Sequence, residues 1–505
     1  MALARVTTFA LDGVEARCVW VEADIRSGLP AFSIVGLADK AVREARERVR
    51  AAVTNSGYVY PNERITINLA PAFLRKAGAA FDLPVAVALL GASGQLSAEA
   101  TEDCAIVGEL SLYGEVRPMR GALAMAEATR RGGVGRIVVP RRRAAEAALV
   151  PELDVLGVQT LQETVEVLAG SRPAPPLPPP GAAGEAEPEE PDLSDVRGHN
   201  ALVPALEVAA AGGHNLFLHG PPGTGKTMLA RRLPSILPPM TPAEAIEVTR
   251  LASIAGRHEG GLVTRRPFRA PHHTISASGL VGGGSPPAPG EATLAHHGVL
   301  FLDELSEFIR PALEALRQPL EDGRVTIVRA QRVMVFPTRV TLVAASNPCG
   351  CGMGEDACRC SAADLARHHR RLSGPLLDRI DVSVTVGRPS ARALDTQAAP
   401  PSAAVRERIV AARERQTARL AGTGLTCNAQ LTARGLRQVG AATPEALRLL
   451  HVLYDRNRLS ARGHGRILRV ARTLADLAGS ERVQPDHVHQ AAALRLDDQA
   501  LSLAA

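Results

Sequence analysis

A strand, a glycine-rich loop and a helix in direct succession decide the fold of this chain. Asn215-Leu-Phe-Leu-His219 is an apolar run of strand length, Gly220-Pro-Pro-Gly-Thr-Gly-Lys-Thr227 follows it, and residues 228–237 (MLARRLPSIL) have helical character. The loop fits the pattern GxxxxGK[ST] in full and stands in the strand–loop–helix context that the pattern requires. Its glycines let backbone N–H groups face phosphate oxygens at a helix N-terminus, so the stretch predicts an ATP site.

Two further apolar strands end in residues that suit ATP hydrolysis. Val299-Leu-Phe-Leu302 runs into Asp303 and Glu304, and the strand Arg339–Ala345 precedes Asn347. Helical stretches separate the strands, which is the pattern of a parallel α/β sheet with crossover helices. We expect Asp303 to hold Mg²⁺ through water, Glu304 to polarise the attacking water and Asn347 to orient that water. An Asn after a strand is also common in turns.

The glycine-rich loop and the second strand together make up the expected nucleotide site. Lys226 is expected on the β- and γ-phosphates, with the hydroxyl of Thr227 on Mg²⁺. Lysine makes the match specific, because it stands at only three positions of the chain. The residues expected to bind ATP and Mg²⁺ are Gly220, Pro221, Pro222, Gly223, Thr224, Gly225, Lys226, Thr227 and Asp303.

Four contiguous stretches carry a resemblance to a known family. They are GPPGTGKTMLARRLP (220–234), PGEATLAHHGVLFLDELSEF (289–308), AASNPCGCG (344–352) and SGPLLDRID (373–381). They resemble the Mg-chelatase-like branch of AAA+ ATPases, and specifically the YifB/ComM family, over nearly the whole chain. The resemblance implies an ATP-hydrolysing P-loop AAA+ core with a helical lid, assembled into a ring that is expected to be a homo-hexamer.

The resemblance also assigns roles to single residues. Asn347 matches the family's sensor asparagine, and Arg379 matches the arginine finger that reaches a neighbouring subunit's γ-phosphate. A local ion pair of Arg379 with Asp378 or Asp381 is the alternative. A second sensor arginine is expected in the lid at Arg462 or Arg466, and the glycines around them leave that choice open.

Two segments are candidates for the pore of such a ring. Gly323–Arg332 alternates like a hairpin, and Arg324, Arg329 and Arg332 are expected to contact DNA phosphates, although a solvated hairpin explains the same pattern. The glycine-rich stretch from Phe268 to Gly284 resembles an insertion of the family and suggests a mobile loop. It contains the pair His272 and His273, and such a pair in a loop is more often not a metal site.

A cluster of cysteines follows the sensor strand. The spacing CxC-x6-CxC places four thiols within twelve positions, which suits a structural Zn²⁺ site. Each pair is spaced more tightly than zinc ligands usually are, so four reduced free cysteines are the alternative. The residues are Cys349, Cys351, Cys358 and Cys360.

The N-terminal part resembles the fold of Lon-type serine–lysine proteases. Lys76–Asp82 lines up with the nucleophile loop, but Ala80 stands at the serine position, and Leu123 stands where the lysine base would be. Neither side chain can perform those steps, so the resemblance implies an inactive α/β domain.

The composition of the chain indicates its domain boundaries and the compartment in which it works. The Pro-rich and acidic stretch 171–191 reads as a linker between an N-terminal domain (1–170) and an ATPase core (192–400), with a helical lid at 401–505. A net charge of +6 over 505 residues does not by itself imply nucleic acid, and 3% aromatic residues argue against a base-stacking platform. The longest apolar run, Leu83–Ala92, is too short to span a bilayer, so we expect a cytoplasmic protein without membrane contact.

These observations favour a ring ATPase that couples hydrolysis to DNA remodelling, such as unwinding or branch migration during DNA uptake or recombination. The rival functions are a chelatase-type motor and a chaperone-like motor, each acting on a protein partner. The candidate pore segments carry no aromatic residue between His272 and Gly284 or between Arg324 and Arg332, which favours DNA modestly.

Overall fold

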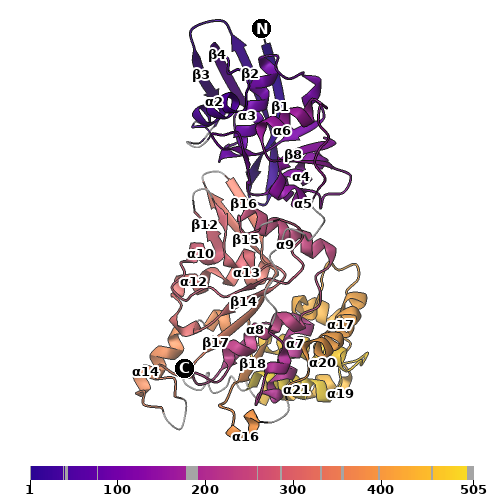
Figure 1. The fold of residues 1–505 in the computed structure, drawn as a ribbon. Coiled ribbons are helices and arrows are strands. Elements are labelled where there is room, and N and C mark those ends of the chain that lie inside the picture. Colours follow the sequence, from indigo (N-terminus) through magenta and orange to yellow (C-terminus); the bar gives the residue numbers. More distant parts are fainter. Residues whose placement is uncertain are drawn as a thin grey trace. The chain divides into compact units, whose positions relative to one another are not determined.

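The computed structural model describes residues 2–496, except for 38, 40, 41, 43, 77, 178–190, 259, 285–286, 330–331, 354–357, 373, 396–397 and 457–458. The chain forms two compact units (Figure 1). Unit 1 comprises Met1–Glu187, Pro242–Thr264 and Val328–Phe336, and unit 2 comprises Pro188–Thr241, Arg265–Ile327 and Pro337–Ala505. Most of the expected linker, residues 178–190, lies outside the described residues.

Unit 1 is built on a mixed seven-stranded sheet. Its strand order is β3-β4-β2-β1-β5-β8-β9, with antiparallel pairing of β1 with β2 and of β2 with β4, and parallel pairing elsewhere. The strands are β1 (Ala2–Asp12), β2 (Glu15–Arg26), β3 (Ala31–Val35), β4 (Arg64–Ala70), β5 (Cys104–Ile106), β8 (Arg136–Pro140) and β9 (Asp154–Val158). The strands predicted at 64–69 and 136–140 are thus confirmed as β4 and β8.

Helices cover both faces of this sheet. The apolar run Leu83–Ala92 lies in a helix that is buried along almost its whole length, because it packs between the sheet and its neighbours. The helix predicted at 39–56 is described only from Ala45 onward. The helices are α2 (Ala45–Asn55), α3 (Asp82–Ala92), α4 (Ala122–Arg131), α5 (Arg141–Ala147) and α6 (Leu161–Leu168), and β6 (Glu109–Leu110) pairs with β7 (Val116–Arg117).

A helix from the middle of the chain also belongs to unit 1. In α9 (Pro242–Ile254), Ile254 is buried in the core cluster that contains α4. The Ser253 hydroxyl accepts a hydrogen bond of 3.0 Å from the Gly121 N–H at the start of α4. Arg250 forms an ion pair of 2.7 Å with Glu127. Charge, hydrogen bonding and apolar burial therefore all attach α9 to the N-terminal residues, which periodicity along the chain does not indicate.

Unit 2 contains the parallel sheet that the sequence predicts. Its order is β11-β14-β17-β10-β18, and every pairing within it is parallel. The strands are β10 (Leu216–His219), β11 (Phe268–Arg269), β14 (Val299–Leu302), β17 (Thr341–Ser346) and β18 (Val382–Thr385). The first strand of this sheet along the chain, β10, lies between β17 and β18, so the loop after it opens where the strand order reverses.

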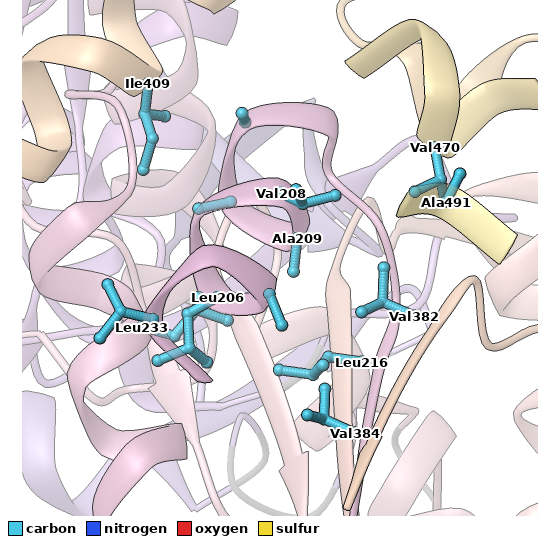
Figure 2. Close-up of a cluster of buried hydrophobic side chains, with 14 of the residues drawn as sticks. Leu206, Val208, Ala209, Leu216, Leu233, Val382, Val384, Ile409, Val470 and Ala491 are labelled. Carbon is cyan, nitrogen blue, oxygen red and sulfur yellow. The ribbon is translucent and has the colours of Figure 1, made fainter. Parts of the chain in front are cut away.

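Alternate residues of these strands enter two different cores. Leu216 and Leu218 point into one cluster, whereas Phe217 points into the other. Because both faces are covered, the strands are continuously apolar and do not alternate with polar residues. In Figure 2, Leu206, Val208 and Ala209 of one helix lie beside strand residues Leu216, Val382 and Val384.

The C-terminal part is helical, as predicted. Helices α7 (Val203–Gly212) and α8 (Lys226–Ile236) pack with α17 (Ser402–Arg419), and α20 (Ala461–Leu477) packs with α7 and α21 (Pro485–Leu496) (Figure 1). The other helices of unit 2 are α10 (Ala277–Val281), α11 (Glu291–Leu294), α12 (Arg310–Ala315), α13 (Arg317–Asp322), α14 (Ala362–Arg371), α15 (Gly374–Leu377), α16 (Ala391–Leu394), α18 (Ala433–Val439) and α19 (Pro444–Arg456). No described helix is both long enough and apolar enough to cross a membrane.

The hairpin and the glycine-rich insertion are more ordered than the sequence suggests. The hairpin consists of β15 (Arg324–Arg329) and β16 (Arg332–Pro337), so it extends five residues beyond the predicted end. In the insertion expected to be a mobile loop, Gly279 lies within α10, while β12 (Gly282–Gly283) pairs with β13 (Ala288–Pro289). A Cβ at Gly282 would come within 2.9 Å of the Ala288 carbonyl oxygen, so close backbone approach explains that glycine.

Candidate nucleotide site

The loop between β10 and α8 has backbone conformations that favour glycine, including a φ of +73° at Gly223. A Cβ at Gly220 would lie 2.1 Å from the carbonyl oxygen of Val386, and Gly225 has a φ of +92°. Gly225 stands directly before the first residue of α8, which is 11 residues long. The loop therefore wraps the N-terminus of a helix with free N–H groups, which is an anion-binding arrangement.

Lys226 is held inside this loop. Its Nζ donates to the carbonyl oxygens of Gly220 (2.6 Å) and Pro221 (2.8 Å) and to Oδ1 of Asn347 (3.0 Å). Burial lowers the pKa of Lys226, and the nearby carboxylates of Asp303 and Glu304 oppose that shift. Phosphate oxygens entering the loop would replace weaker carbonyl partners of the ammonium with fully charged ones.

The hydroxyl of Thr227 meets the acid at the end of β14. Thr227 Oγ1 donates to Asp303 Oδ2 at 2.6 Å, and Asp303 Oδ1 accepts from the Glu304 N–H at 3.0 Å. A hydroxyl and a carboxylate are oxygen ligands of the kind that Mg²⁺ takes together with phosphates and water. The two residues therefore fit the predicted magnesium site.

Glu304 occupies an unusual backbone conformation. Its φ is +52°, which costs a non-glycine residue about 1 kcal/mol or more and is often found at functional sites. The side chain is 57% exposed, and its carboxylate lies 3.4 Å from Nδ1 of His273. His273 follows β11, the parallel neighbour of β14, so both residues reach the same sheet edge. The sequence placed His273 in a candidate pore loop, where a metal site was disfavoured, and did not indicate this contact.

Asn347 joins the site from the third strand. It follows β17, its Oδ1 accepts from Lys226, and its backbone oxygen accepts from Nε2 of His368 at 3.0 Å. The structure thus brings together Lys226, Thr227, Asp303 and Asn347, which lie up to 121 positions apart in the chain.

His219, the last residue of β10, was not identified from the sequence. Its Nε2 is buried and has no hydrogen-bond partner among the described residues. Burial, together with the charge of Lys226, lowers the pKa of His219 to about 4, so the ring is neutral near pH 7. A neutral ring avoids a second positive charge beside the lysine.

The predicted arginines differ widely in their surroundings. Arg379 is largely buried and forms an ion pair with Glu321. Arg462 is 67% exposed and lies 3.8 Å from Asp378. Arg466 is buried 3.8 Å from Asp381, and this burial lowers its pKa to about 10.

The hairpin presents both charge and apolar surface. Arg324 is exposed, whereas the side chains of Arg329 and Arg332 lie outside the described part of the structure. Val328 and Val333 are 68% and 64% exposed. Sequence reasoning concentrated on the arginines and missed these exposed valines.

The predicted cysteine cluster is assembled in space. The Sγ atom of Cys349 lies 3.3 Å from that of Cys351 and 3.6 Å from that of Cys358. With Cys360 they form a group of four potential metal ligands. Within the described residues, His272 and His273 belong to no such group.

The candidate protease positions of unit 1 are packed with apolar side chains. Leu123 is 1% exposed, and Ala80 packs against the same core cluster. Lys76 is fully buried and its Nζ donates to the backbone oxygens of Leu69 (2.8 Å) and Pro71, while burial lowers its pKa. This lysine therefore fastens a loop between strand and helix.

Comparison with known proteins identifies the family of this chain. Models described as "Magnesium chelatase, subunit ChlI", "Subunit ChlI of Mg-chelatase" and "Magnesium chelatase, subunit ChlI C-terminal" match residues 192–394, 21–143 and 399–495. YifB of Escherichia coli is 42% identical over 509 residues, covering 99% of this chain and 98% of YifB. Competence protein ComM of Haemophilus influenzae is 41% identical over 506 residues, 98% of each chain. The chain belongs to the YifB/ComM family.

Membership of the YifB/ComM family confirms the resemblance drawn from the four motif stretches. The fold is accordingly mixed α/β with a mainly parallel sheet in an AAA+-like Mg-chelatase domain. A Lon protease of Mycolicibacterium smegmatis is 26% identical over 175 residues, which is 33% of this chain and 22% of the protease. The Lon likeness is therefore partial, whereas the YifB/ComM likeness is full-length.

Proposed function

We propose that this chain is a ring-forming ATPase that couples Mg-ATP hydrolysis to DNA remodelling, as a helicase or branch-migration motor in DNA uptake or recombination. The proposal rests mainly on the hydrogen bonds of Lys226 with Asn347 and of Thr227 with Asp303. These bonds bring the four side chains together at one edge of the parallel sheet. The choice of DNA rests on 41% identity to a protein named for competence.

Each residue of the site has one task in this proposal. The loop amides and Lys226 bind the phosphates, and Thr227 and Asp303 hold the metal, which neutralises charge on the β- and γ-phosphates when bound. Glu304 accepts the proton of the attacking water, and the Asn347 side chain orients that water. The Lys226–Asn347 hydrogen bond keeps the phosphate-binding and water-orienting groups in one geometry before ATP enters.

In the proposed ring, an arginine of one subunit completes the ATP site of the next. We assign Arg379 as the finger that reaches the γ-phosphate of a neighbouring subunit in a homo-hexamer. In the isolated chain its guanidinium is held by Glu321, an exposed partner that it can exchange for phosphate. Between the two lid candidates we assign the second sensor to Arg462, because its charge is exposed and weakly paired, whereas Arg466 is buried against Asp381.

The remaining parts have supporting roles in the proposal. Residues 192–400 form the motor core, except for Pro242–Thr264 and Val328–Phe336, which belong to unit 1. Residues 401–505 act as the lid, and Arg324, Arg329 and Arg332 contact DNA phosphates from the hairpin. Residues 1–170 form an inactive Lon-like scaffold joined by the linker 171–191. The seven free cysteines suit the reducing cytoplasm, where we place the protein.

The decisive experiment measures ATP hydrolysis with and without single-stranded and forked DNA at modest salt, because phosphate contacts weaken as salt rises. We expect DNA to stimulate hydrolysis. Glu304→Gln should lower kcat about 100-fold or more while the protein still binds nucleotide. Glu307→Gln is the matched control, because this carboxylate lies three positions on and is 48% exposed.

The outcome also separates the rival functions. Hydrolysis that is indifferent to DNA would contradict the DNA motor and favour the chelatase-type or chaperone-like motor acting on a protein partner. No hydrolysis at concentrations that form rings would contradict the roles given to Glu304 and Arg379.

A further inference from the structure

The four cysteine sulfurs of unit 2 lie at the distances that one tetrahedral metal ion requires. The Sγ separations between Cys349, Cys351 and Cys358 are 3.3, 3.6 and 3.8 Å, and all four ligand atoms lie within 4.8 Å of one another. A Zn–S bond of about 2.3 Å in tetrahedral geometry places neighbouring sulfurs about 3.8 Å apart. A disulfide would bring two sulfurs to about 2.05 Å, much closer than these pairs.

Local structure explains how such tight CxC pairs reach this arrangement. The chain turns back after Cys349, where the N–H of Gly352 donates to the Cys349 carbonyl at 3.0 Å and Gly352 has a φ of +76°. The N–H of Cys351 donates to the sulfur of Cys360 at 3.3 Å, which neutralises part of the charge on a thiolate. The turn offsets the short spacing that argued against zinc in the sequence.

The cluster lies next to the nucleotide site on two sides. Cys349 stands two positions after Asn347, whose carbonyl accepts a hydrogen bond from His368 of α14. The helix α14 begins at Ala362, and its N-cap Ser361, directly after Cys360, forms a capping box with Asp364. On the other side, a Cβ built at Gly352 would lie 3.0 Å from Cδ of Pro222 in the phosphate-binding loop.

We propose that Cys349, Cys351, Cys358 and Cys360 bind one Zn²⁺ ion and that this centre positions Asn347 and the phosphate-binding loop relative to each other. Zn²⁺ binding converts the four thiols to thiolates and releases four protons. The ion fastens the end of β17 to the start of α14, so the segment that carries Asn347 is held at both ends. The positioning role rests on the proposed ATPase function, whereas the metal site does not.

Metal content tests the site independently of activity. Elemental analysis of the full chain, purified without added metal, should find about one zinc per chain in the wild type. The control variant Cys18→Ser, which replaces an exposed cysteine outside the cluster, should contain the same amount. Cys358→Ser should lose most of it. Should that variant not fold, titrating wild-type protein with a mercurial thiol reagent should release one zinc as four thiols react. Iron in place of zinc, or no metal even after zinc is supplied, would overturn the proposal.

A matched glycine pair tests the positioning role. Gly352→Ala forces a Cβ toward Pro222 at a positive φ, whereas a Cβ at Gly350, two positions earlier, meets nothing within 4 Å. We expect Gly352→Ala to lower kcat about tenfold or more and Gly350→Ala to leave kcat near wild type, because small misplacements of reacting groups are costly. Both variants are compared with the wild type at equal zinc content. Equal activity of the two variants would contradict the positioning role. An inactive wild type would contradict the proposed function alone and leave the metal result standing.

Discussion

The contact between His273 and Glu304 is a residue-scale feature that connects the insertion to the hydrolytic site. The two side chains lie 3.4 Å apart, and His273 also meets the ring of Phe308 edge-on at 6.4 Å. A histidine held by an aromatic ring can keep an otherwise exposed carboxylate in one orientation. The proposed water-activating group is therefore steered by a segment that the sequence indicated only as a pore candidate.

Replacing His273 tests this steering. We expect His273→Ala to lower kcat about fivefold, the equivalent of roughly 1 kcal/mol, because Glu304 loses its partner. Nucleotide affinity should not change, since His273 contacts none of the phosphate-binding groups that the structure describes. The measurement is steady-state ATP hydrolysis beside nucleotide titration, with His272→Ala as the neighbouring control. Equal effects of the two variants would contradict a specific role for His273.

His219 gives unit 2 a built-in acid sensitivity. The pKa of His219 is lowered to about 4 in the folded chain, against about 6.5 for a histidine in an unfolded one. Between these values the unfolded state binds a proton that the folded state does not bind, so the free energy of unfolding falls as the pH falls. The full effect is on the order of 3 kcal/mol.

Thermal unfolding measured between pH 7 and pH 4 checks this linkage. The melting temperature of the wild type should fall more steeply with acid than that of His219→Gln, which has no ring to protonate. His489→Gln, at an exposed position of α21, should keep the wild-type slope. Parallel curves for wild type and His219→Gln would show that another group causes the acid sensitivity.

At the scale of elements, a buried polar network connects the segment of the proposed finger with α20. Asp381, two positions after Arg379, accepts from Nδ1 of His214 at 3.1 Å and lies 3.4 Å from Arg469. Burial by itself would raise the pKa of Asp381, but the His214 hydrogen bond and the charges of Arg469 and Arg466 lower it. One carboxylate thus connects α20 with His214, just before β10, and with the segment of the proposed finger.

Removing that carboxylate should destabilise unit 2. Asp381→Ala leaves His214, Arg466 and Arg469 without a buried negative partner, so we expect a loss of about 3 kcal/mol. Asp378→Ala, whose side chain is 53% exposed and 3.8 Å from Arg462, should cost less than about 1 kcal/mol. Calorimetric melting of the two variants distinguishes the cases, and equal melting temperatures would contradict a stabilising network.

At the scale of the whole molecule, the proposed site is shared between subunits, and mixing two inactive variants tests that sharing. Lys226→Ala lacks phosphate binding but keeps Arg379, and Arg379→Ala has the opposite defect. Where the two meet in one ring, an intact loop can face an intact finger, so the mixture should recover hydrolysis that neither variant shows alone. Glu321→Ala, which frees the finger from its ion pair, should retain activity. A mixture as inactive as its components would contradict a finger acting between subunits.

Much of the fold could be predicted because its signals are local. The strand, loop and helix at 215–237 lie within one short stretch, and β4 and β8 agree with their predicted spans within one residue. The residues that follow the strands could also be assigned to one site, since parallel strands bring their carboxyl ends to the same edge of the sheet. Prediction was weaker for the CxC pairs, whose short spacing in sequence argued against a four-cysteine metal site. The turn at Gly352 brings the four sulfurs together in spite of that spacing.

The sequence by itself determined the glycine-rich loop, the acids and the amide at the strand ends, and the family, since each depends on contiguous residues whose chemistry is fixed by their type. Only the tertiary structure decided that α9 packs with the N-terminal unit, that Glu321 forms an ion pair with Arg379, that His273 contacts Glu304 and that Gly352, in the turn between the cysteines, lies close to Pro222. These contacts join residues from separate elements. No period or motif encodes them, because they arise only when burial of both faces of the sheet sets the positions of the loops between its strands.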